Sequence, residues 1–582
     1  MINSEQEKLT DPAQAFLQPA NATHRQYEAL RAFFVDQLPS KEAARRFGYS
    51  EGSFRVLVHH FRQDLSKPFF LPPAKGPQQA PKSDPVRTHI VAARKQNLSI
   101  YDIQRLLQGQ GHALSPAYIG LILKQEGFAR LPRRSEEERP EHPQPDPAPV
   151  ADVQQLDLAP RQFRTQFGGL FLFAPYLAEI PWEGIFERNG FPGSKMIPAA
   201  HALRALLGLK LYGSARHSHV MSEVFDPGLA LFAGLNCIPK RSFLTEYSSR
   251  IGPAAYPKAM RQWFDRMQAL GLPRGESFDL DFHTIPFHGE DALLQKHYVS
   301  KRSRRQKGLL AFVAQDADTH VFCYGNAQVR KETQNDEVLR FVAFWKERTG
   351  QLPRELIFDS KLTTYGNLAK LTAQRIDFIT LRRRSQAMLQ EVWSQPASAW
   401  RQIHLEGFSR IYRDPRVIDQ RIELAGYPGA IRQLIVADLG HEEPTFLLTN
   451  QLTRSAPKLI GRYARRMIIE NRIQDSIDFF HMDALSSAVP MKVDCDLQLT
   501  LMGSSLYRLL GNAIGQGYER AKSRTLFRDF VDAHATVDLG AKDIRVRFQK
   551  RAHNPLLLKA QFDKKHPAVP WLDNKKLHLV FG

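Results

Sequence analysis

Between residues 277 and 384 the hydropathy pattern changes in an order that restricts the fold more than any other part of the chain. The segment SFDLDFHTIP alternates apolar and polar residues with the period of a strand. Two further strand-like segments, GLLAFVAQ and HVFCYGNAQV, meet at a predicted hairpin turn around Asp316 and Asp318. Residues 335–348 carry apolar side chains at helical spacing, and a strand, a helix and a strand follow. The order β-β-β-α-β-α-β predicts an α/β domain.

Acidic residues occupy two of these strands. In the first strand the aromatic side chains form one face, and Asp279 and Asp281 lie on the opposite face. Asp359 directly follows the buried-type strand at 356–358. A later segment, GRYARRMIIENRIQDSIDFF, is a predicted helix with Glu470 on it. The two strand positions and this helix are therefore the candidate sources of a cluster of carboxylates.

The composition restricts the partners and the compartment. The 582 residues include 80 Lys and Arg against 60 Asp and Glu, a formal net charge of +20, so we expect a polyanionic partner such as nucleic acid. No run of about 20 apolar residues appears, which excludes a membrane-spanning helix, and the start of the chain does not look like a secretion signal. Three widely separated cysteines support neither a zinc knuckle nor a disulfide framework. We expect a cytoplasmic protein of roughly three or four domains.

Two small helical modules are predicted near the start of the chain, at residues 24–64 and 84–131. In the first, a glycine-containing turn joins two short helices, and Ser50 caps the second of them, which is the helix-turn-helix pattern. Arg55 and His59 lie four residues apart on one exposed face of that helix, which can enter the major groove of DNA. The second module repeats the plan. The alternative is that both are helical hairpins that do not bind DNA.

Composition and periodicity also divide the rest of the chain. The predicted segments are a Pro-rich linker (132–150), a helical domain (153–275), two parts of the α/β core (276–384 and 458–520), a β-rich insertion (385–457) and a basic C-terminal region (521–582). The C-terminal region holds 13 Lys and Arg against 6 Asp.

The strand and helix order, with one acid on the first strand and one at the end of the fourth, resembles the ribonuclease H-like fold. In that fold the first and fourth strands are adjacent and parallel, which would bring Asp281 and Asp359 together, and a later helix supplies a third carboxylate. The segments DFHTIP, LIFDSKLTTYG and YARRMIIE together resemble the DDE transposases of bacterial insertion sequences, in the group with a β-rich insertion and a Y-x2-R-x3-E helix. The match covers roughly residues 277–522.

The resemblance implies a multidomain protein in which α-helical N-terminal DNA-binding modules precede an α/β ribonuclease H-like core interrupted by a β-rich insertion. It implies a DNA transposase that binds element ends, makes metal-dependent hydrolytic nicks and joins the freed 3′-hydroxyl to target DNA. The partner would be double-stranded DNA, on which the protein would act as a homodimer or a larger assembly. In the cell it would be cytoplasmic and associated with the bacterial nucleoid.

The resemblance also implies that Asp281, Asp359 and Glu470 are both catalytic residues and metal ligands. Phosphodiester cleavage must stabilise charge on the attacking and the leaving oxygen, which two divalent cations about 4 Å apart can do. Mg²⁺ prefers oxygen ligands and keeps several waters, so a few carboxylates suffice, and Mn²⁺ is expected to substitute for it. Crowded acids repel one another and raise their pKa values, so the cation would also stabilise the site.

Basic and aromatic residues near the acids are predicted DNA contacts. Tyr463, Arg466 and Glu470 are spaced i, i+3 and i+7, which places all three on one helix face. The predicted DNA-binding residues are Tyr463, Arg466, Arg55, His59, Arg302, Arg304, Arg305, Arg382 and Arg383. The family often has a lysine seven residues after the glutamate, whereas this chain has Ile477, so a phosphate contact must come from elsewhere. For each basic stretch the alternative is a solvated surface.

Each site residue has an alternative role. Asp279 shares the polar face of the strand with Asp281 and could be the first ligand, and His283 could be a ligand or a hydrogen-bonding neighbour. Asp359 could merely cap the next helix. Glu470 could be a solvated helix residue with an arginine as its ion-pair partner.

Two other functions fit the same pattern. The first is a nuclease of the same fold that cuts DNA without joining strands. The second is a non-enzymatic DNA-binding regulator derived from a transposase. The carboxylates alone do not separate the transposase from the nuclease, since both cut through the same kind of site.

Overall fold

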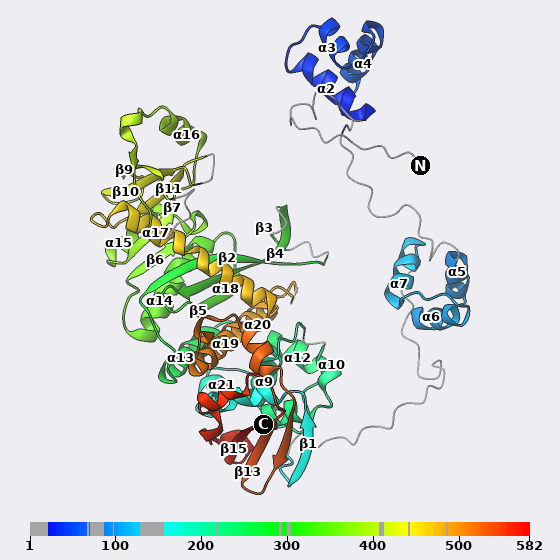
Figure 1. Ribbon diagram of the computed structural model, residues 1–582, viewed down its shortest axis with the longest axis vertical. Helices are drawn as coiled ribbons and strands as arrows, with labels where there is room; N and C mark the ends of the chain where they lie inside the picture. Colours follow the sequence, from blue (N-terminus) through cyan, green and yellow to red (C-terminus); the bar gives the residue numbers. More distant parts are fainter. Residues whose placement is uncertain are drawn as a thin grey trace. The chain divides into compact units, whose positions relative to one another are not determined.

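The structure is a computed structural model, and its contacts divide the chain into two units, Met1–Asp146 and Pro147–Gly582. The described residues are 21–66, 69, 86–96, 98–128, 156–216, 219–289, 294–299, 304–406, 413–439, 443–484 and 487–582. Helices and strands are both abundant, so the chain is a mixed α/β protein (Figure 1). The predicted linker at 132–150 lies outside the described residues.

The first module of the N-terminal unit consists of α2 (Ala22–Phe34), α3 (Ser40–Arg46) and α4 (Glu51–Gln63). The predicted cap of α4 is confirmed, because Ser50 accepts a hydrogen bond from the Ser53 N–H at 3.2 Å. Phe54 and Val58 of α4 are buried with alanines of the other two helices in a small apolar core. Three short helices on one core match the expected module.

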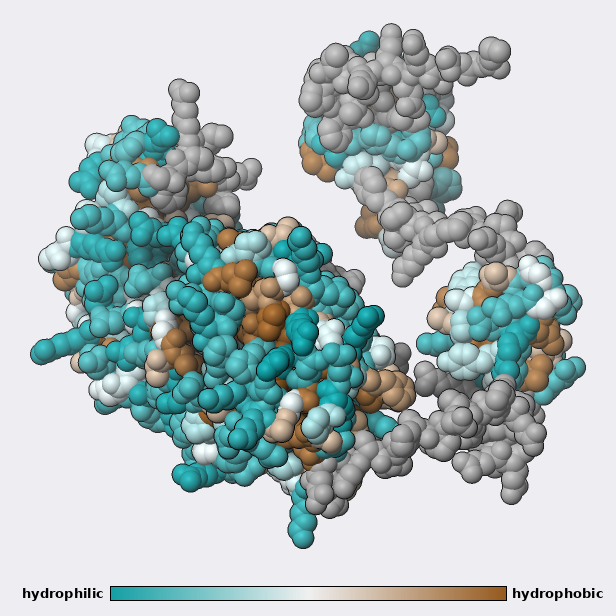
Figure 2. All heavy atoms as spheres, turned by 60° about the horizontal axis from the view of Figure 1, so that its bottom comes forward, coloured by the Kyte–Doolittle hydropathy of each residue, from teal (hydrophilic) through white to brown (hydrophobic). Residues whose placement is uncertain are grey.

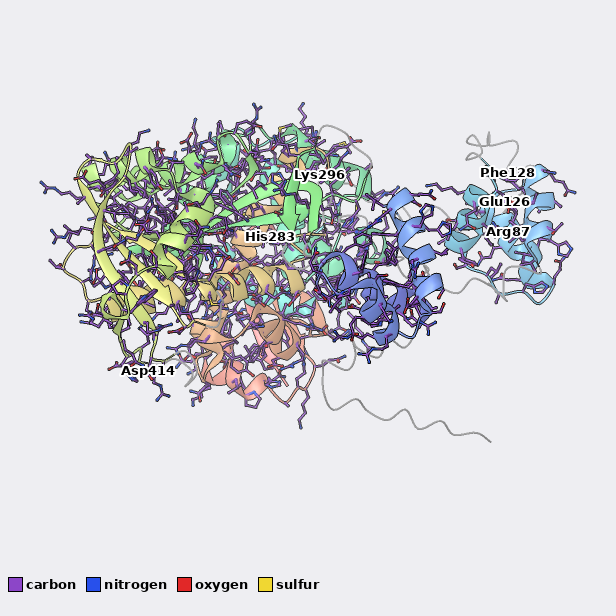
Figure 3. The ribbon with its side chains drawn as sticks, turned by 90° about the horizontal axis from the view of Figure 1, so that it is seen from above. Arg87, Glu126, Phe128, His283, Lys296 and Asp414 are labelled. Atoms are coloured by element: carbon purple, nitrogen blue, oxygen red, sulfur yellow. The ribbon has the colours of Figure 1, made fainter. Side chains whose placement is uncertain are left out.

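The second module consists of α5 (Arg87–Lys95), α6 (Ile100–Gly109) and α7 (Pro116–Gln125). Ser99 and Asp102 form a capping box at the start of α6, and Ser115 caps α7. An ion pair between Arg87 and Glu126 ties the start of α5 to the end of α7 (Figure 3). This module also has its own apolar core.

A ten-stranded sheet forms the centre of the second unit. Its first part contains β2 (Ser277–Pro286), β3 (Lys296–Val299), β4 (Arg304–Asp316), β5 (Phe322–Val329), β6 (Glu355–Phe358) and β7 (Asp377–Leu381). In space the order is β5-β4-β2-β6-β7. The strands β2, β6 and β7 are parallel, and β4 is antiparallel to both of its neighbours, β2 and β5. The predicted hairpin is confirmed, and α14 (Glu337–Thr349) and α15 (Tyr365–Ala373) join the strands as expected, but β3 is an additional strand that was not predicted.

The strands predicted as a β-rich insertion continue this sheet. They are β8 (Arg401–Gln402), β9 (Arg416–Glu423), β10 (Ala430–Ala437) and β11 (Thr445–Thr449). β11 pairs with β7 in antiparallel fashion, and β10, β9 and β8 follow outward. Apolar side chains point to both faces, where α16 (Gln386–Trp393) covers one and α17 (Ala456–Arg465) the other. The insertion therefore shares its sheet with the core.

The helix predicted around Glu470 is in fact two helices. α17 ends at Arg465 and α18 (Met467–Asp478) begins after Arg466, which lies at the junction. The Arg466 N–H donates to the Tyr463 carbonyl and the Ile469 N–H to the Arg466 carbonyl, both three residues apart. This overwound turn replaces one turn of regular α-helix.

The region predicted as a helical domain, 153–275, also contributes a strand. β1 (Arg161–Thr165) pairs with β12 (Ala535–Leu539) near the end of the chain. These two strands form a separate five-stranded sheet, in the order β1-β12-β13-β15-β14, with β13 (Asp543–Phe548), β14 (Ala568–Val569) and β15 (Lys575–Phe581). The basic C-terminal region is thus a folded α/β part that shares its sheet with residues near 161.

Mostly buried helices connect the two sheets. They include α9 (Ala199–Leu211), α13 (Ala255–Ala269) and α19 (Pro490–Ile514). The surface seen in Figure 2 is largely hydrophilic, with scattered apolar patches. Within the described ranges no helix is both long enough and apolar enough to cross a membrane.

The packing of β2 on α14 generates a stability prediction. Phe278 is fully buried, with its ring centroid 5.1 Å from that of Phe341 and 4.4 Å from that of Trp345. We expect Phe278→Ala to lower the free energy of unfolding by about 3–5 kcal/mol, because it removes apolar burial and leaves a cavity. Thermal unfolding followed by near-UV circular dichroism measures the change. Val580→Ala, at a 44% exposed position, should stay within about 0.5 kcal/mol of wild type, and equal effects would contradict this packing.

Candidate active site

The pairing of β2 with β6 brings two acids to one place. The strands are parallel, and their last paired residues are Leu280 and Phe358. Asp281 and Asp359 each follow directly after that pair. The two carboxylates therefore lie side by side although 77 residues separate them in the sequence, which agrees with the predicted adjacency.

Glu470 reaches the same place from α18. The carboxylates of Asp359 and Glu470 both interact electrostatically with Asp281. The guanidinium group of Arg466 is 2.8 Å from Asp281 Oδ1 and interacts electrostatically with the other two acids as well. Its Nε also donates to the Leu280 carbonyl at 3.3 Å. The structure thus brings the three predicted acids within electrostatic reach of one another and of one arginine.

Burial dominates the electrostatics of Asp281. It raises the pKa of this carboxyl, and the charges of Asp359 and Glu470 raise it further. The guanidinium of Arg466 and the N–H of Phe282, which donates to Oδ1 at 2.8 Å, act in the opposite direction. The net pKa of Asp281 stays above its ordinary value, with burial as the main cause and the two neighbouring acids adding to it.

The two other residues of the helix motif respond to the same charges. Burial by itself would lower the pKa of Arg466, but Asp281 and the neighbouring acids raise it above its ordinary value. Burial raises the pKa of Tyr463, with Arg466 opposing and the acids adding. Arg466 is therefore a permanent cation, and Tyr463 stays a neutral hydroxyl donor.

Asp279 belongs to a different cluster. It is 2% exposed and its Oδ1 lies 2.9 Å from Arg462 Nη2. Arg462 Nε in turn donates to Glu355 at 2.9 Å, and Arg454 pairs with the same glutamate at 2.6 Å. Burial raises the pKa of Asp279, whereas Arg462 lowers it. An acid held in a buried ion-pair network is poorly placed to bind a metal, so the geometry favours Asp281 over Asp279 as the first ligand.

Sequence reasoning missed this network. Arg462 lies four residues before Arg466, on the same side of the helix, so the spacing was available as a signal. Glu355 carried no such signal, because an acid at the start of a short strand is ordinarily exposed. Against its own burial, hydrogen bonds and charges from Gln451, Arg462 and Arg454 hold the pKa of Glu355 below its ordinary value.

Asp359 and Glu470 differ in exposure. Asp359 is half-buried, and its carboxylate accepts a hydrogen bond from the Ser360 N–H. It therefore caps the short helix Ser360–Leu362, which is the alternative role considered for it above. Glu470 is exposed. Across the described residues no group of three His, Cys, Asp or Glu side chains is arranged so that it could hold a metal ion.

The predicted DNA contacts on the N-terminal module are exposed. The Arg55 side chain is 73% exposed and lies 3.6 Å from Glu51, one turn earlier on α4. His59 is exposed on the same helix and its ring lies 5.9 Å from that of His60. Both can reach a ligand without rearrangement of the module.

The predicted contacts in the second unit fall into three groups. Arg302, like the side chain of Arg304, lies outside the described part of the chain, whereas Arg305 and Arg383 are exposed. Arg382 is half-buried and donates to Gln433 Oε1 at 2.8 Å and to the Tyr365 hydroxyl at 3.3 Å. Its guanidinium is thus held by the extended sheet.

His283 lies on β2 two residues beyond Asp281 and is half-buried (Figure 3). It belongs to the same polar face of the strand as the two acids.

A comparison with models of known protein families finds no match, and neither does a comparison with curated proteins. The residues and their geometry are therefore the basis of the functional proposal.

The opposite pKa directions of Asp281 and Glu355 predict opposite effects on stability. The folded chain keeps the Asp281 proton to higher pH than the unfolded chain, so ionisation of Asp281 lowers the free energy of unfolding as the pH rises through its pKa. We expect Asp281→Asn to have a higher Tm than wild type at pH 7. The difference should vanish below about pH 4, where Asp281 is protonated in both states.

Glu355 is the matched comparison. Its lowered pKa stabilises the folded chain above about pH 4, and this stabilisation is lost as the pH falls through the folded-state pKa. We expect Glu355→Gln to lower the free energy of unfolding by about 2 kcal/mol at pH 7 and by less at acidic pH. Differential scanning calorimetry between pH 3 and 8 measures both variants. The same pH trend in both would contradict these assignments.

Proposed function

We propose that this chain is a DDE transposase of the bacterial insertion-sequence type. One observation carries the proposal: Asp281 pairs with Arg466 where β2 lies beside the end of β6, and Asp359 and Glu470 interact electrostatically with both. Three acids from two strands and a distant helix thus share one arginine. Perturbed pKa values and convergent charges are typical of catalytic sites.

The strand arrangement supports a ribonuclease H-like core. The order β5-β4-β2-β6-β7, with the first and fourth core strands adjacent and parallel, agrees with the plan inferred from the sequence. The third acid comes from a helix that follows the core strands in the chain, as that plan requires. The added strands β8–β11 stand where the family has its β-rich insertion.

The donor set fits magnesium. All three ligands would be carboxylate oxygens, which Mg²⁺ and Mn²⁺ prefer. When bound between Asp281, Asp359 and Glu470, the cations would supply positive charge for the attacking and the leaving oxygen of a phosphodiester. Asp281, Asp359 and Glu470 are the residues that would hold the cations.

Arg466 and Tyr463 would both contact the DNA strand that is cut. The Arg466 guanidinium, now paired with Asp281, is a fork that matches two oxygens of a phosphate. Tyr463, one turn earlier and still protonated, can donate a hydrogen bond to the same strand of DNA. The exposed Arg55 and His59 of the N-terminal module would bind the element ends. Double-stranded DNA is thus the proposed partner, bound by a homodimer or a larger assembly.

Loss of a single carboxylate is the central test. We expect full-length protein to nick supercoiled DNA in Mg²⁺ or Mn²⁺, and Asp281→Asn, Asp359→Asn and Glu470→Gln each to slow nicking by at least about a hundredfold. Asp414→Asn is the control, because this exposed carboxylate pairs only locally with His404 (Figure 3). Full nicking by Asp359→Asn would exclude the site, and a wild type that nicks in neither metal would favour the regulator.

A second assay separates the transposase from the nuclease. Wild-type protein is given donor DNA with a free 3′-hydroxyl, and a covalent joint to target DNA is sought on a denaturing gel. Joined product supports the transposase, whereas nicking without joining supports the nuclease of the same fold.

Arg466 predicts a separation of metal binding from catalysis. Without its positive charge the three carboxylates should bind Mn²⁺ more tightly, by at least about tenfold in Arg466→Ala. Nicking should nevertheless fall, because the phosphate partner is lost. Arg466→Lys keeps the charge and should bind Mn²⁺ like wild type. Isothermal titration calorimetry measures the affinities, and weaker Mn²⁺ binding by the alanine variant would contradict the arrangement of charges described here.

A further inference from the structure

Three arginines and a histidine lie on the far side of α18 from Glu470. This basic cluster consists of His320 in the β4–β5 turn, Arg472 on α18, Arg508 on α19 and Arg520 at the end of the short helix Tyr518–Arg520. Burial and the neighbouring arginines lower the pKa of His320, so the arginines carry the positive charge of the cluster. Arg472 comes two residues after Glu470, which is about 200° around the helix. The helices that carry the cluster lie close to the start of the C-terminal α20 (Ser523–Leu526) in Figure 1.

Backbone carbonyl groups orient two of these arginines. Arg472 Nη2 donates to the Arg520 carbonyl at 3.5 Å, and Arg508 Nη1 donates to the Glu519 carbonyl. His320 interacts electrostatically with all three guanidinium groups, so the four side chains converge from four separate segments. Carbonyl oxygens satisfy N–H groups but carry no net charge. The positive charge of the cluster is therefore not neutralised by these bonds.

The neighbouring acids balance the arginines only in part. One carboxylate, that of Asp475, faces both Arg472 and Arg508, and its Oδ2 also accepts hydrogen bonds from the Ser523 N–H and hydroxyl, both at 3.0 Å. Asp316, near His320, accepts from backbone N–H groups of its own turn. Burial lowers the pKa of Arg472, and burial together with the charge of Arg472 lowers that of Arg508 to about 10.

A half-buried excess of like charge raises the free energy of the folded chain unless an anion neutralises it. Three guanidinium forks match the oxygens of a phosphate better than those of a single carboxylate. The cluster lies only about one helix diameter, roughly 10 Å, from Glu470. A DNA strand that is cut at the carboxylates would carry further phosphates within reach of this distance.

We propose that the basic cluster binds a phosphate group of the DNA backbone beside the position of cleavage, an inference that rests on the proposed function. It supplies the phosphate contact that Ile477 cannot make, since Ile477 packs against the hydrophobic core. The basic cluster would contact the DNA strand from the side of α18 that is opposite to the acids. Arg472 and Glu470 would thus place one DNA strand along two sides of the same helix.

Salt-dependent DNA binding tests this site. Full-length protein carrying Asp359→Asn, in EDTA, binds a labelled duplex, and fluorescence anisotropy gives Kd over a range of salt concentrations. We expect Arg472→Gln and Arg508→Gln each to reduce the slope of log Kd against log salt by about 0.9, the value for one lost phosphate contact. Arg508→Lys keeps the charge and should keep the slope. Arg416→Gln, at an exposed position paired with Asp438, is the matched control and should also keep it.

Thermal unfolding of the same variants without DNA completes the test. Inorganic phosphate should raise the Tm of the protein, and Arg472→Gln should abolish this rise. If the variants lower the Tm but leave the salt slope unchanged, the arginines are structural and the proposal is overturned. If phosphate raises the Tm while the slopes stay unchanged, the cluster binds a free anion and not DNA. Because binding is measured in EDTA, its outcome is independent of whether wild-type protein nicks DNA.

Discussion

The parallel pairing of β2 with β6 is the constraint on which the candidate site depends. The register places Leu280 opposite Phe358, so Asp281 within β2 lies beside Asp359, which directly follows the end of β6. A shift of one residue would turn one of the two side chains to the opposite face of the sheet. Apolar residues hold the register, because Phe278 and Leu280 on one strand and Leu356 and Phe358 on the other are all buried in the same core.

The helix above this strand neutralises the buried acids in a regular way. Asp279 pairs with Arg462 and Asp281 with Arg466. Residues four apart on a helix are about 6 Å apart along its axis, and residues two apart on a strand are about 6.6 Å apart. Two arginines at helical spacing can therefore face two aspartates at strand spacing. Glu355 also pairs with Arg462 and so holds the Asp279–Arg462 pair in place. The Asp281–Arg466 pair instead faces two further acids, Asp359 and Glu470.

Periodicity predicted the local elements of the core well. β2 has the bounds read from its alternation, and α14 was found within two residues because its apolar spacing is regular. Periodicity also indicated the three acids as candidates, since each lies at a recognisable end or face of an element. The break at Arg466 was not found, because hydrogen bonds to residues three positions back leave no mark in hydropathy. The pairing of β1 with β12 was not found either, since strand partners across hundreds of residues share no local signal.

Side-chain periodicity and charge were enough to predict most strands and helices of the core, how basic the chain is, and which acids stand at the ends of these elements. The tertiary structure was needed to show that the insertion extends the same sheet. It also showed that Asp279 is held by Arg462, whereas Asp281 pairs with Arg466 and faces two other acids. Those facts depend on which surfaces pack together. Burial and the proximity of charges arise only when distant segments meet, so no local pattern could specify them.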